Sequence, residues 1–235
     1  MARLARVVIP GVPHHVTQRG NRQLPIFFND SDRSLYLKLV RDGCDAADVR
    51  CLGWCLMDNH VHLILVPSDA DGLRAALGEA HRRYTRHVNT REGWRGFLFQ
   101  GRFASYPMDD SHLMAAIRYV ENNPVAAGLV RSAKQWHWSS ARSHVAGRRT
   151  ANDPLTDVAA LGLHVANWHA MLRFGLEAGG ATAPGLALAE AIETRLRTGR
   201  PLAADAWIAR QESALGRSLM PGRRGRKSHQ GAGKK

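Results

Sequence analysis

The chain has 235 residues, 44% of them hydrophobic, which is enough for one elaborated domain or for one domain with a smaller appendage. No run of 18 apolar residues occurs, so we expect no membrane span, and the N-terminal stretch lacks the apolar core of a secretory signal. Lys and Arg outnumber Asp and Glu by 33 to 20, a formal charge of +13. A basic chain of this size usually binds a polyanion, so we expect a nucleic-acid partner.

The distribution of charge and the number of cysteines indicate the partner and the cellular compartment of the protein. Seven basic residues and no acidic one lie between Arg217 and Lys235, and the rest of the chain still carries +6. The three cysteines are too few and odd in number for a disulfide framework. We therefore expect a protein of a reducing cytoplasm.

The first third of the chain alternates strand and helix patterns. Residues 12–19 alternate apolar and polar side chains, as a half-buried strand does, and an Arg-Gly-Asn-Arg turn follows. Asp30 or Ser31 is expected to cap a helix that runs to about Ala47. Residues 49–57 and 60–66 are predicted strands, and Asp58-Asn59 between them indicates a hairpin.

The pattern continues to about residue 150. A second helix is predicted over 72–89, with an apolar face and a face rich in arginine. Residues 94–107 are aromatic and glycine-rich, which indicates an irregular strand or hairpin. A third helix starts near Asp110 or Ser111 and runs past Tyr119 towards Pro124, where an Asn-Pro pair is a helix stop. The order β-α-β-β-α-β-α predicts an α+β fold, with helices on one face of a mostly antiparallel sheet.

The remainder has a different character. Residues 152–154 and 179–185 are typical of linkers, and three short helical patterns lie near 164–177, 184–198 and 203–216. We therefore expect a main domain over 1–150, a helical appendage over 151–216 and a basic, disordered tail over 217–235.

His60 and His62 are the first candidate residues for a metal-binding site. Residues two apart on a strand point to the same face, so the two imidazoles would form half of a divalent-metal site. The competing interpretation is ordinary packing, since single histidines on strands are usually packed or solvated. The pair in an otherwise apolar strand favours a metal site modestly.

Other enzymes with such pairs fit this sequence less well. A histidine-triad hydrolase needs a third alternating histidine, where Ile64 stands. A zinc deaminase needs His-x-Glu and Pro-Cys-x-x-Cys, which are absent from the sequence. Cys51 and Cys55 would face the same side of a strand but too far apart to chelate as a zinc knuckle does, and we expect them to be core residues.

The predicted third helix adds a nucleophile. Tyr119 lies off the apolar stripe of this helix, and Asn123 is one turn further on the same side. Alone, this pattern would be an ordinary tyrosine before an Asn-Pro stop. Together with the histidines it fits a tyrosine that attacks a phosphodiester polarised by a metal ion. An oxygen ligand from Asn123 beside two imidazoles suits Mg²⁺ or Mn²⁺ better than a closed zinc site.

Five segments in series resemble the REP-associated tyrosine transposases, within the HUH (His-hydrophobic-His) single-strand transposases. They are PGVPHHVTQRGNR, WCLMDNHVHLILVP, FQGRFASYPMDD, IRYVENNPVAAGLV and WHWSSARSHVAG, at 10–22, 54–67, 99–110, 117–130 and 136–147. They cover roughly the first two-thirds of the chain. The C-terminal segment TGRPLAADAWIARQESALGR also resembles extensions found in these proteins.

The resemblance implies a ferredoxin-like core in residues 1–150, metal ligands at His60 and His62, a nucleophile at Tyr119 and a third, amide ligand at Asn123. It also implies hairpin substrates flanked by a short tetranucleotide. Cleavage would leave a 5′-phosphotyrosine and a free 3′-hydroxyl, and ATP would not be needed. The catalytic positions show no departure from the family's pattern.

Several polar residues are candidates for contacts with DNA. The basic face of the second helix would meet phosphates, and the first loop and the QGRF segment would present donors to bases or backbone. An Arg-Gly-Arg in the tail partly matches a minor-groove motif. Phe97, Phe99 and Phe103 could stack on bases, although we expect most of them in the core. The candidates are Arg19, Asn21, Arg22, Arg82, Arg83, Arg86, Gln100, Arg102, Arg224 and Arg226.

Two other functions stay open from the sequence. One is a metal-dependent nuclease in which water attacks, and the other is a domesticated hairpin-DNA binder without turnover. The chain would act as a monomer or a homodimer, and the sequence does not decide between them.

Overall fold

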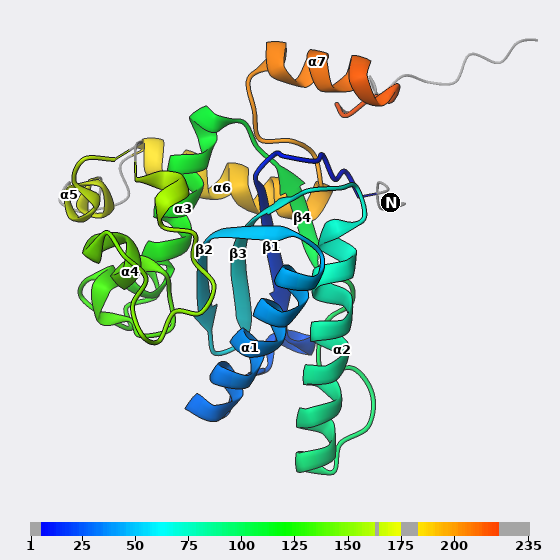
Figure 1. Ribbon diagram of the computed structural model, residues 1–235, viewed down its shortest axis with the longest axis vertical. Helices are drawn as coiled ribbons and strands as arrows, with labels where there is room; N and C mark the ends of the chain where they lie inside the picture. The colour runs from blue at the N-terminus through cyan, green and yellow to red at the C-terminus, as the bar shows by residue number, and fades with distance from the viewer. Residues whose placement is uncertain (1–5, 163–164, 175–182, 221–235) are drawn as a thin grey trace, which may run out of the picture.

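A computed structural model describes residues 6–162, 165–174 and 183–220 of the chain (Figure 1). Its centre is an antiparallel sheet in the order β2-β3-β1-β4. The strands are β1 (His14–Arg19), β2 (Val49–Met57), β3 (His60–Pro67) and β4 (Ala104–Pro107). The hairpin predicted around Asp58-Asn59 is therefore present, and β1 pairs with both β3 and β4.

Helices cover both faces of this sheet. Helices α1 (Asp30–Ala46) and α2 (Gly72–Glu92) pack on one face, around Val16, Leu63 and Leu65. Helix α3 (Asp110–Ala126) packs on the other face, around Ile64 and Tyr106 (Figure 1). The predicted α+β class is confirmed. The expectation that helices cover only one face of the sheet was incomplete. The side chains of β3 are buried on both faces, so each face needs helices to cover it.

The alternation along β2 is broken by a register shift between Cys51 and Gly53. Cys51 consequently packs towards α1, whereas Cys55 packs towards α3. The expectation that the two thiols share a face was wrong, since a bulge adds a residue and reverses the alternation. Both thiols are buried, and burial raises their pKa values well above the ordinary range, as befits core residues.

Two helix ends differ from the sequence prediction. The side chain of Asn29, rather than Asp30 or Ser31, caps α1 by accepting the backbone N–H of Asp32. Pro124 lies inside the last turn of α3, which continues to Ala126, so the Asn-Pro pair does not stop the helix. Asn123 therefore remains on regular helix, one turn beyond Tyr119.

A second half of the molecule packs behind and beside α3. It contains α4 (Ala141–Ala146), α5 (Trp168–Arg173), α6 (Ala183–Thr198) and α7 (Asp205–Leu215), joined by the short 3-10 turns η2 (Ala133–Gln135) and η3 (Ala159–Leu161). A further 3-10 turn, η1 (Asn21–Gln23), follows β1. Helix α6 contacts β4 and α3, whereas α7 lies away from the sheet (Figure 1). None of the described helices is long and apolar enough to span a membrane.

A buried carboxylate attaches this half to α3. Glu121 is fully buried and accepts hydrogen bonds from Ser140 (2.5 Å), from Nδ1 of His144 (2.6 Å) and from Nε1 of Trp168 (2.8 Å). A buried carboxylate is tolerated only when its oxygens are paired in this way. The contacts hold α3, and with it Tyr119, in a fixed position against the sheet.

Candidate active site

The histidine pair lies where β3 begins, on the face of the sheet that α3 covers. The imidazole centroids of His60 and His62 are 4.9 Å apart, with the rings nearly perpendicular. His62 is 1% exposed, whereas His60 is half-buried and its Nδ1 bonds the side chain of Asn59 at 2.6 Å. The alternation of the strand thus brings both rings to one side, as the sequence predicted.

Helix α3 places Tyr119 and Asn123 over this pair. The ring centroid of Tyr119 is 5.7 Å from that of His62, in an edge-to-face arrangement. The side chain of Asn123 acts on both His60 and Tyr119: it works against the lowering of the His60 pKa and against the raising of the Tyr119 pKa. The structure therefore brings together all four residues that the sequence singled out for metal binding and attack, while their chemical roles remain predictions.

Burial sets the protonation of the site. Desolvation, with a smaller effect from Arg19, lowers the pKa of His60 to about 4, and it lowers the pKa of His62 well below 6.5. Desolvation, followed by the carboxylate of Glu193, raises the pKa of Tyr119 to about 12. At neutral pH both imidazoles are uncharged and can offer lone pairs, and the tyrosine keeps its proton.

The donor set fits a divalent metal of the oxygen-and-nitrogen type. Nε2 of His62 is buried and has no hydrogen-bond partner in the described part of the chain, a condition that a metal ligand would satisfy. No group of three His, Cys, Asp or Glu side chains converges among the described residues. The sequence predicted the amide oxygen of Asn123 as a third ligand, and an oxygen beside two imidazoles suits Mg²⁺ or Mn²⁺ better than zinc.

The sequence missed three residues at this site. His15 on β1 and Tyr106 on β4 stand behind His62, with His15 Nε2 only 2.9 Å from His62 Nδ1. Glu193 on α6 accepts a hydrogen bond from the Tyr119 hydroxyl at 3.3 Å. The adjacent histidines in the segment at 10–22 were a signal for His15, but only the strand pairing shows which one faces the site.

A known protein family matches the part of the chain that contains His60, His62, Tyr119 and Asn123. Residues 12–123 match the family model described as transposase IS200 like. The domain that residues 12–123 form therefore belongs to the IS200-like transposase family. This confirms the family that the sequence motifs indicated.

Two solved structures resemble this IS200-like chain. One is a REP-associated tyrosine transposase bound to a REP hairpin, with 20% identity, a TM-score of 0.51 and coverage of 67% of this chain and 93% of that one. It supports the fold. The other is a candidate transposase from Deinococcus radiodurans R1, with 20% identity, a TM-score of 0.36 and coverage of 52% and 97%. A comparison with curated proteins finds no match.

In this IS200-like transposase, Arg19 is the DNA-contact candidate nearest the histidines. It ends β1 directly opposite His60, and its charge acts on His60, His62 and Tyr119. Asn21 and Arg22 follow in η1, where Arg22 is exposed and adopts a left-handed φ of 54°. The backbone N–H of Gln100 donates to the carbonyl of Arg19, so the QGRF segment lies beside the same strand end.

A second set of candidates lines a groove of about 590 Å³ between α2 and residues 97–103, which we call the arginine groove. Arg82, Arg86 and Arg102 line it, and Phe97 beside them is 86% exposed. Phe99 and Phe103 are core residues, as expected, at 7% and 6% exposure. Arg83 lies outside the groove on the exposed side of α2. Arg224 and Arg226 lie outside the described residues.

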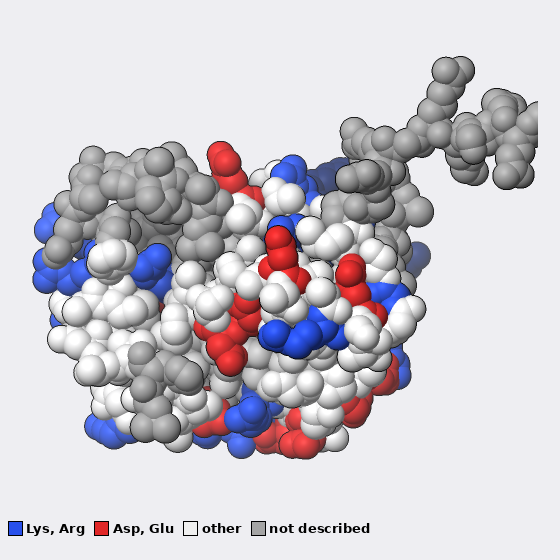
Figure 2. All heavy atoms as spheres, turned by 90° about the horizontal axis from the view of Figure 1, so that it is seen from above, with Lys and Arg blue, Asp and Glu red and all other residues white. Residues whose placement is uncertain are grey.

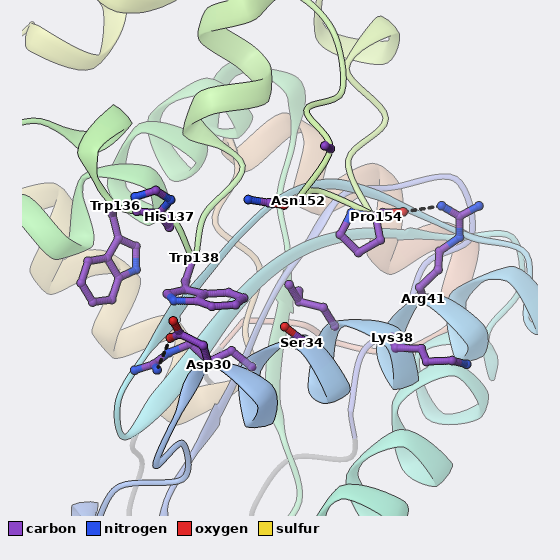
Figure 3. Close-up of a pocket in the computed structure, with 12 residues that line it drawn as sticks. Asp30, Ser34, Lys38, Arg41, Trp136, His137, Trp138, Asn152 and Pro154 are labelled. Carbon is purple, nitrogen blue, oxygen red and sulfur yellow. Dashed lines mark hydrogen bonds and ion pairs between the residues drawn. The ribbon is translucent and has the colours of Figure 1, made fainter.

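A larger hollow, of about 870 Å³, lies between α1 and residues 136–154. Figure 3 shows Trp136, His137 and Trp138 on one side of it, Ser34 and Lys38 on α1, and Arg41 bonded to the carbonyl of Pro154. The basic side chains Arg33, Lys38 and Arg41 are paired with Asp58, Asp42 and Asp45 respectively. Arg82 of the arginine groove is likewise paired, with Glu79, so Arg86 and Arg102 are the stronger candidates for phosphate binding.

Acidic and basic side chains are interspersed over the face shown in Figure 2, which is the top of the molecule in Figure 1. The positive charge of the described body is therefore not gathered into one broad patch on that face. The basic side chains that are candidates for DNA contact lie instead at the end of β1 and along the arginine groove.

Proposed function

We propose that this chain is a metal-dependent, REP-associated type of transposase that cuts and rejoins single-stranded hairpin DNA through a 5′-phosphotyrosine. The observation that carries the proposal is the position of Tyr119 over the histidine pair, with its ring centroid 5.7 Å from that of His62 and with Asn123 one helical turn further along α3. Family membership supports a transposase, and the structure with a similar fold is bound to a REP hairpin.

His60, His62 and Asn123 would hold one Mg²⁺ or Mn²⁺ ion. When bound, such an ion polarises a non-bridging oxygen of the scissile phosphate and offsets the charge that builds there during attack. The neutral state of both imidazoles keeps their lone pairs available at physiological pH. Arg19, whose charge already acts on this cluster, would add a second positive group beside the phosphate.

Tyr119 is the proposed nucleophile. Its hydroxyl donates to Oε1 of Glu193, so this carboxylate is placed to take the proton as the phenol oxygen bonds to phosphorus. The P–O3′ bond breaks, the 3′-oxygen leaves and takes a proton from water, and the 5′-phosphate stays on Tyr119. Rejoining is the reverse: a 3′-hydroxyl attacks the phosphotyrosine, and the phenol oxygen recovers its proton. The phosphodiester energy is conserved, so no ATP is required.

The arginine groove would hold the DNA. Arg82, Arg86 and Arg102 supply positive charge along the groove, and Phe97 offers an exposed ring on which an unpaired base can stack. The groove leads along residues 97–103 to the backbone of Arg19, at the edge of the proposed catalytic cluster. Asn21, Arg22, Arg83 and Gln100 would add contacts around this path.

The division of the chain belongs to the same proposal. Residues 1–150 would be the catalytic domain, 151–216 the helical appendage and 217–235 the basic tail. Leu219 at the start of that tail is buried against Val7, Ile9 and Ile208, so its first residues are part of the folded body. Residues 221–235, including Arg224 and Arg226, lie outside the described part. The proposed setting is the bacterial cytoplasm and nucleoid, with the protein acting as monomer or homodimer.

The test is a covalent-adduct assay with hairpin oligonucleotides taken from the flanks of this gene, incubated with Mn²⁺ or Mg²⁺. A 3′-end label should move with the protein on a denaturing gel, whereas a 5′-end label should appear on a shortened free strand. This pattern is specific to a 5′-phosphotyrosine. Tyr119→Phe should abolish the adduct and keep hairpin binding.

The assay also separates the two alternatives. A nuclease in which water attacks would cut the 3′-labelled and the 5′-labelled strand without forming an adduct. A protein that only binds hairpin DNA would neither cut the strand nor form an adduct. An adduct of undiminished yield in Tyr119→Phe would refute the tyrosine assignment. Cleavage by the wild-type protein that persists in EDTA would refute the metal role of the histidine pair.

A further inference from the structure

Two buried polar side chains, His15 and Tyr106, form a hydrogen-bonded chain behind the proposed metal ligand His62. Nδ1 of His62 is 2.9 Å from Nε2 of His15, and Nδ1 of His15 is 3.0 Å from the hydroxyl of Tyr106. His15 and Tyr106 are each 0% exposed, and the rings of His15 and His62 are stacked with centroids 5.1 Å apart. The sheet fixes these contacts, because β1 lies between β3 and β4 and pairs His15 with Tyr106.

A neutral imidazole has one N–H and one lone pair, so the hydrogens in this chain can run in two directions. In the first, Tyr106 donates to His15, His15 donates to His62, and Nε2 of His62 carries a hydrogen. In the second, His62 donates to His15, His15 donates to Tyr106, and Nε2 of His62 carries a lone pair. Only the second direction lets His62 bind a metal through Nε2.

The surroundings of His62 favour the second direction. Nε2 of His62 has no acceptor among the described residues, so a hydrogen there would be a buried, unsatisfied donor.

We propose that His15 is a positioning residue which accepts the Nδ1 hydrogen of His62 and thereby directs the Nε2 lone pair of His62 towards the metal, with Tyr106 holding the His15 ring. This inference rests on the proposed function, because it concerns the tautomer that a metal ligand needs. His15 touches neither the metal nor the DNA in this arrangement. Its effect is transmitted through one hydrogen bond and one ring stack.

The first test measures Mn²⁺ binding to the full chain by calorimetry and by electron paramagnetic resonance, without DNA. His15→Phe keeps a stacking ring but removes the acceptor, and it should weaken Mn²⁺ binding by about 10- to 100-fold. His15→Gln restores a polar acceptor at a similar reach and should recover most of the affinity. Tyr36→Phe, the matched control, removes a buried tyrosine–histidine hydrogen bond on the opposite face of the sheet and should bind Mn²⁺ as the wild type does.

The outcomes separate this inference from the proposed function. If the wild-type chain binds no Mn²⁺, the metal-dependent function itself fails. If the wild type and His15→Phe bind Mn²⁺ equally, only the positioning role is overturned. If His15→Phe does not fold, the ¹⁵N chemical shifts of His62 in the metal-free wild type decide: a hydrogen on Nδ1 supports the proposal, and a hydrogen on Nε2 overturns it.

Discussion

Acidification should destabilise this fold through two buried histidines that lie apart from the proposed metal ligands. Burial lowers the pKa of His14 to about 4 and that of His81 to about 3. Nδ1 of His14 donates to the carbonyl of Val12 at 2.7 Å, and its Nε2 accepts the backbone N–H of Ile9 at 3.2 Å. His81 bonds the Tyr36 hydroxyl at 3.0 Å. Both rings are built into the fold as neutral groups.

The sign follows from the folded pKa values, which lie below the unfolded value of 6.5. Between about pH 6.5 and 4 the unfolded chain binds more protons than the folded one, so the free energy of unfolding falls as the pH falls. At pH 5 each histidine contributes a loss of about 2 kcal/mol relative to neutral pH, or about 4 kcal/mol for the pair. That is a large part of the roughly 5–15 kcal/mol that stabilises a typical domain.

The assay is urea denaturation at a series of pH values between 7 and 5, in EDTA so that metal binding does not contribute. His81→Gln, which cannot titrate here, should reduce the proton uptake on unfolding near pH 5 by about one. Tyr36→Phe is the matched control: it removes the partner of His81 but keeps the imidazole, so it should lower stability without removing that uptake. A wild-type unfolding free energy that is the same at pH 7 and pH 5 would refute the reasoning.

Three further predictions concern the site, the DNA surface and the core. Asn123→Ala should weaken Mn²⁺ binding by about tenfold or more in calorimetry, because it removes the proposed oxygen ligand. Arg86→Ala should weaken binding to single-stranded DNA and flatten the slope of log K against log salt by about 0.7, the effect of one lost phosphate contact, whereas Arg210→Ala on α7 should leave that slope unchanged. Glu121→Ala should lower the free energy of unfolding by about 3 kcal/mol in urea titrations, because it strips buried donors of their acceptor.

Sequence periodicity identified most of the core elements because their patterns are local. The hairpin around Asp58-Asn59 has a turn signal between two apolar runs, and the two histidines sit at a spacing that one strand must place on one face. Tyr119 and Asn123 are one turn apart on any regular helix. The sequence therefore placed His60 beside His62 and Tyr119 beside Asn123. Only the packing of α3 on β3 was needed to bring these two pairs together.

The rest of the site depends on contacts that no local pattern encodes. His15 supports His62 only because β1 pairs with β3 in one particular register, and a shift of one residue would turn it to the other face. Glu193 reaches Tyr119 from 74 positions away, through the packing of α6 on β4 and α3. The bulge after Cys51 likewise follows from how β2 fits its neighbours, and it reversed the expected orientation of Cys55.

The burial of the histidine pair also restricts how DNA can approach. His62 is enclosed by β1 and α3, whereas His60 is half-buried and lies opposite Arg19 at the end of the sheet. A phosphate can therefore reach a metal held by both imidazoles only from the His60 side. The exposed segments that border this end, η1 and residues 97–102, are bonded to each other and to β1 through backbone hydrogen bonds. Catalytic cluster and arginine groove thus share one edge of the sheet, and we expect a bound strand to run along it, with its unpaired bases towards Phe97 and its scissile phosphate beneath Tyr119.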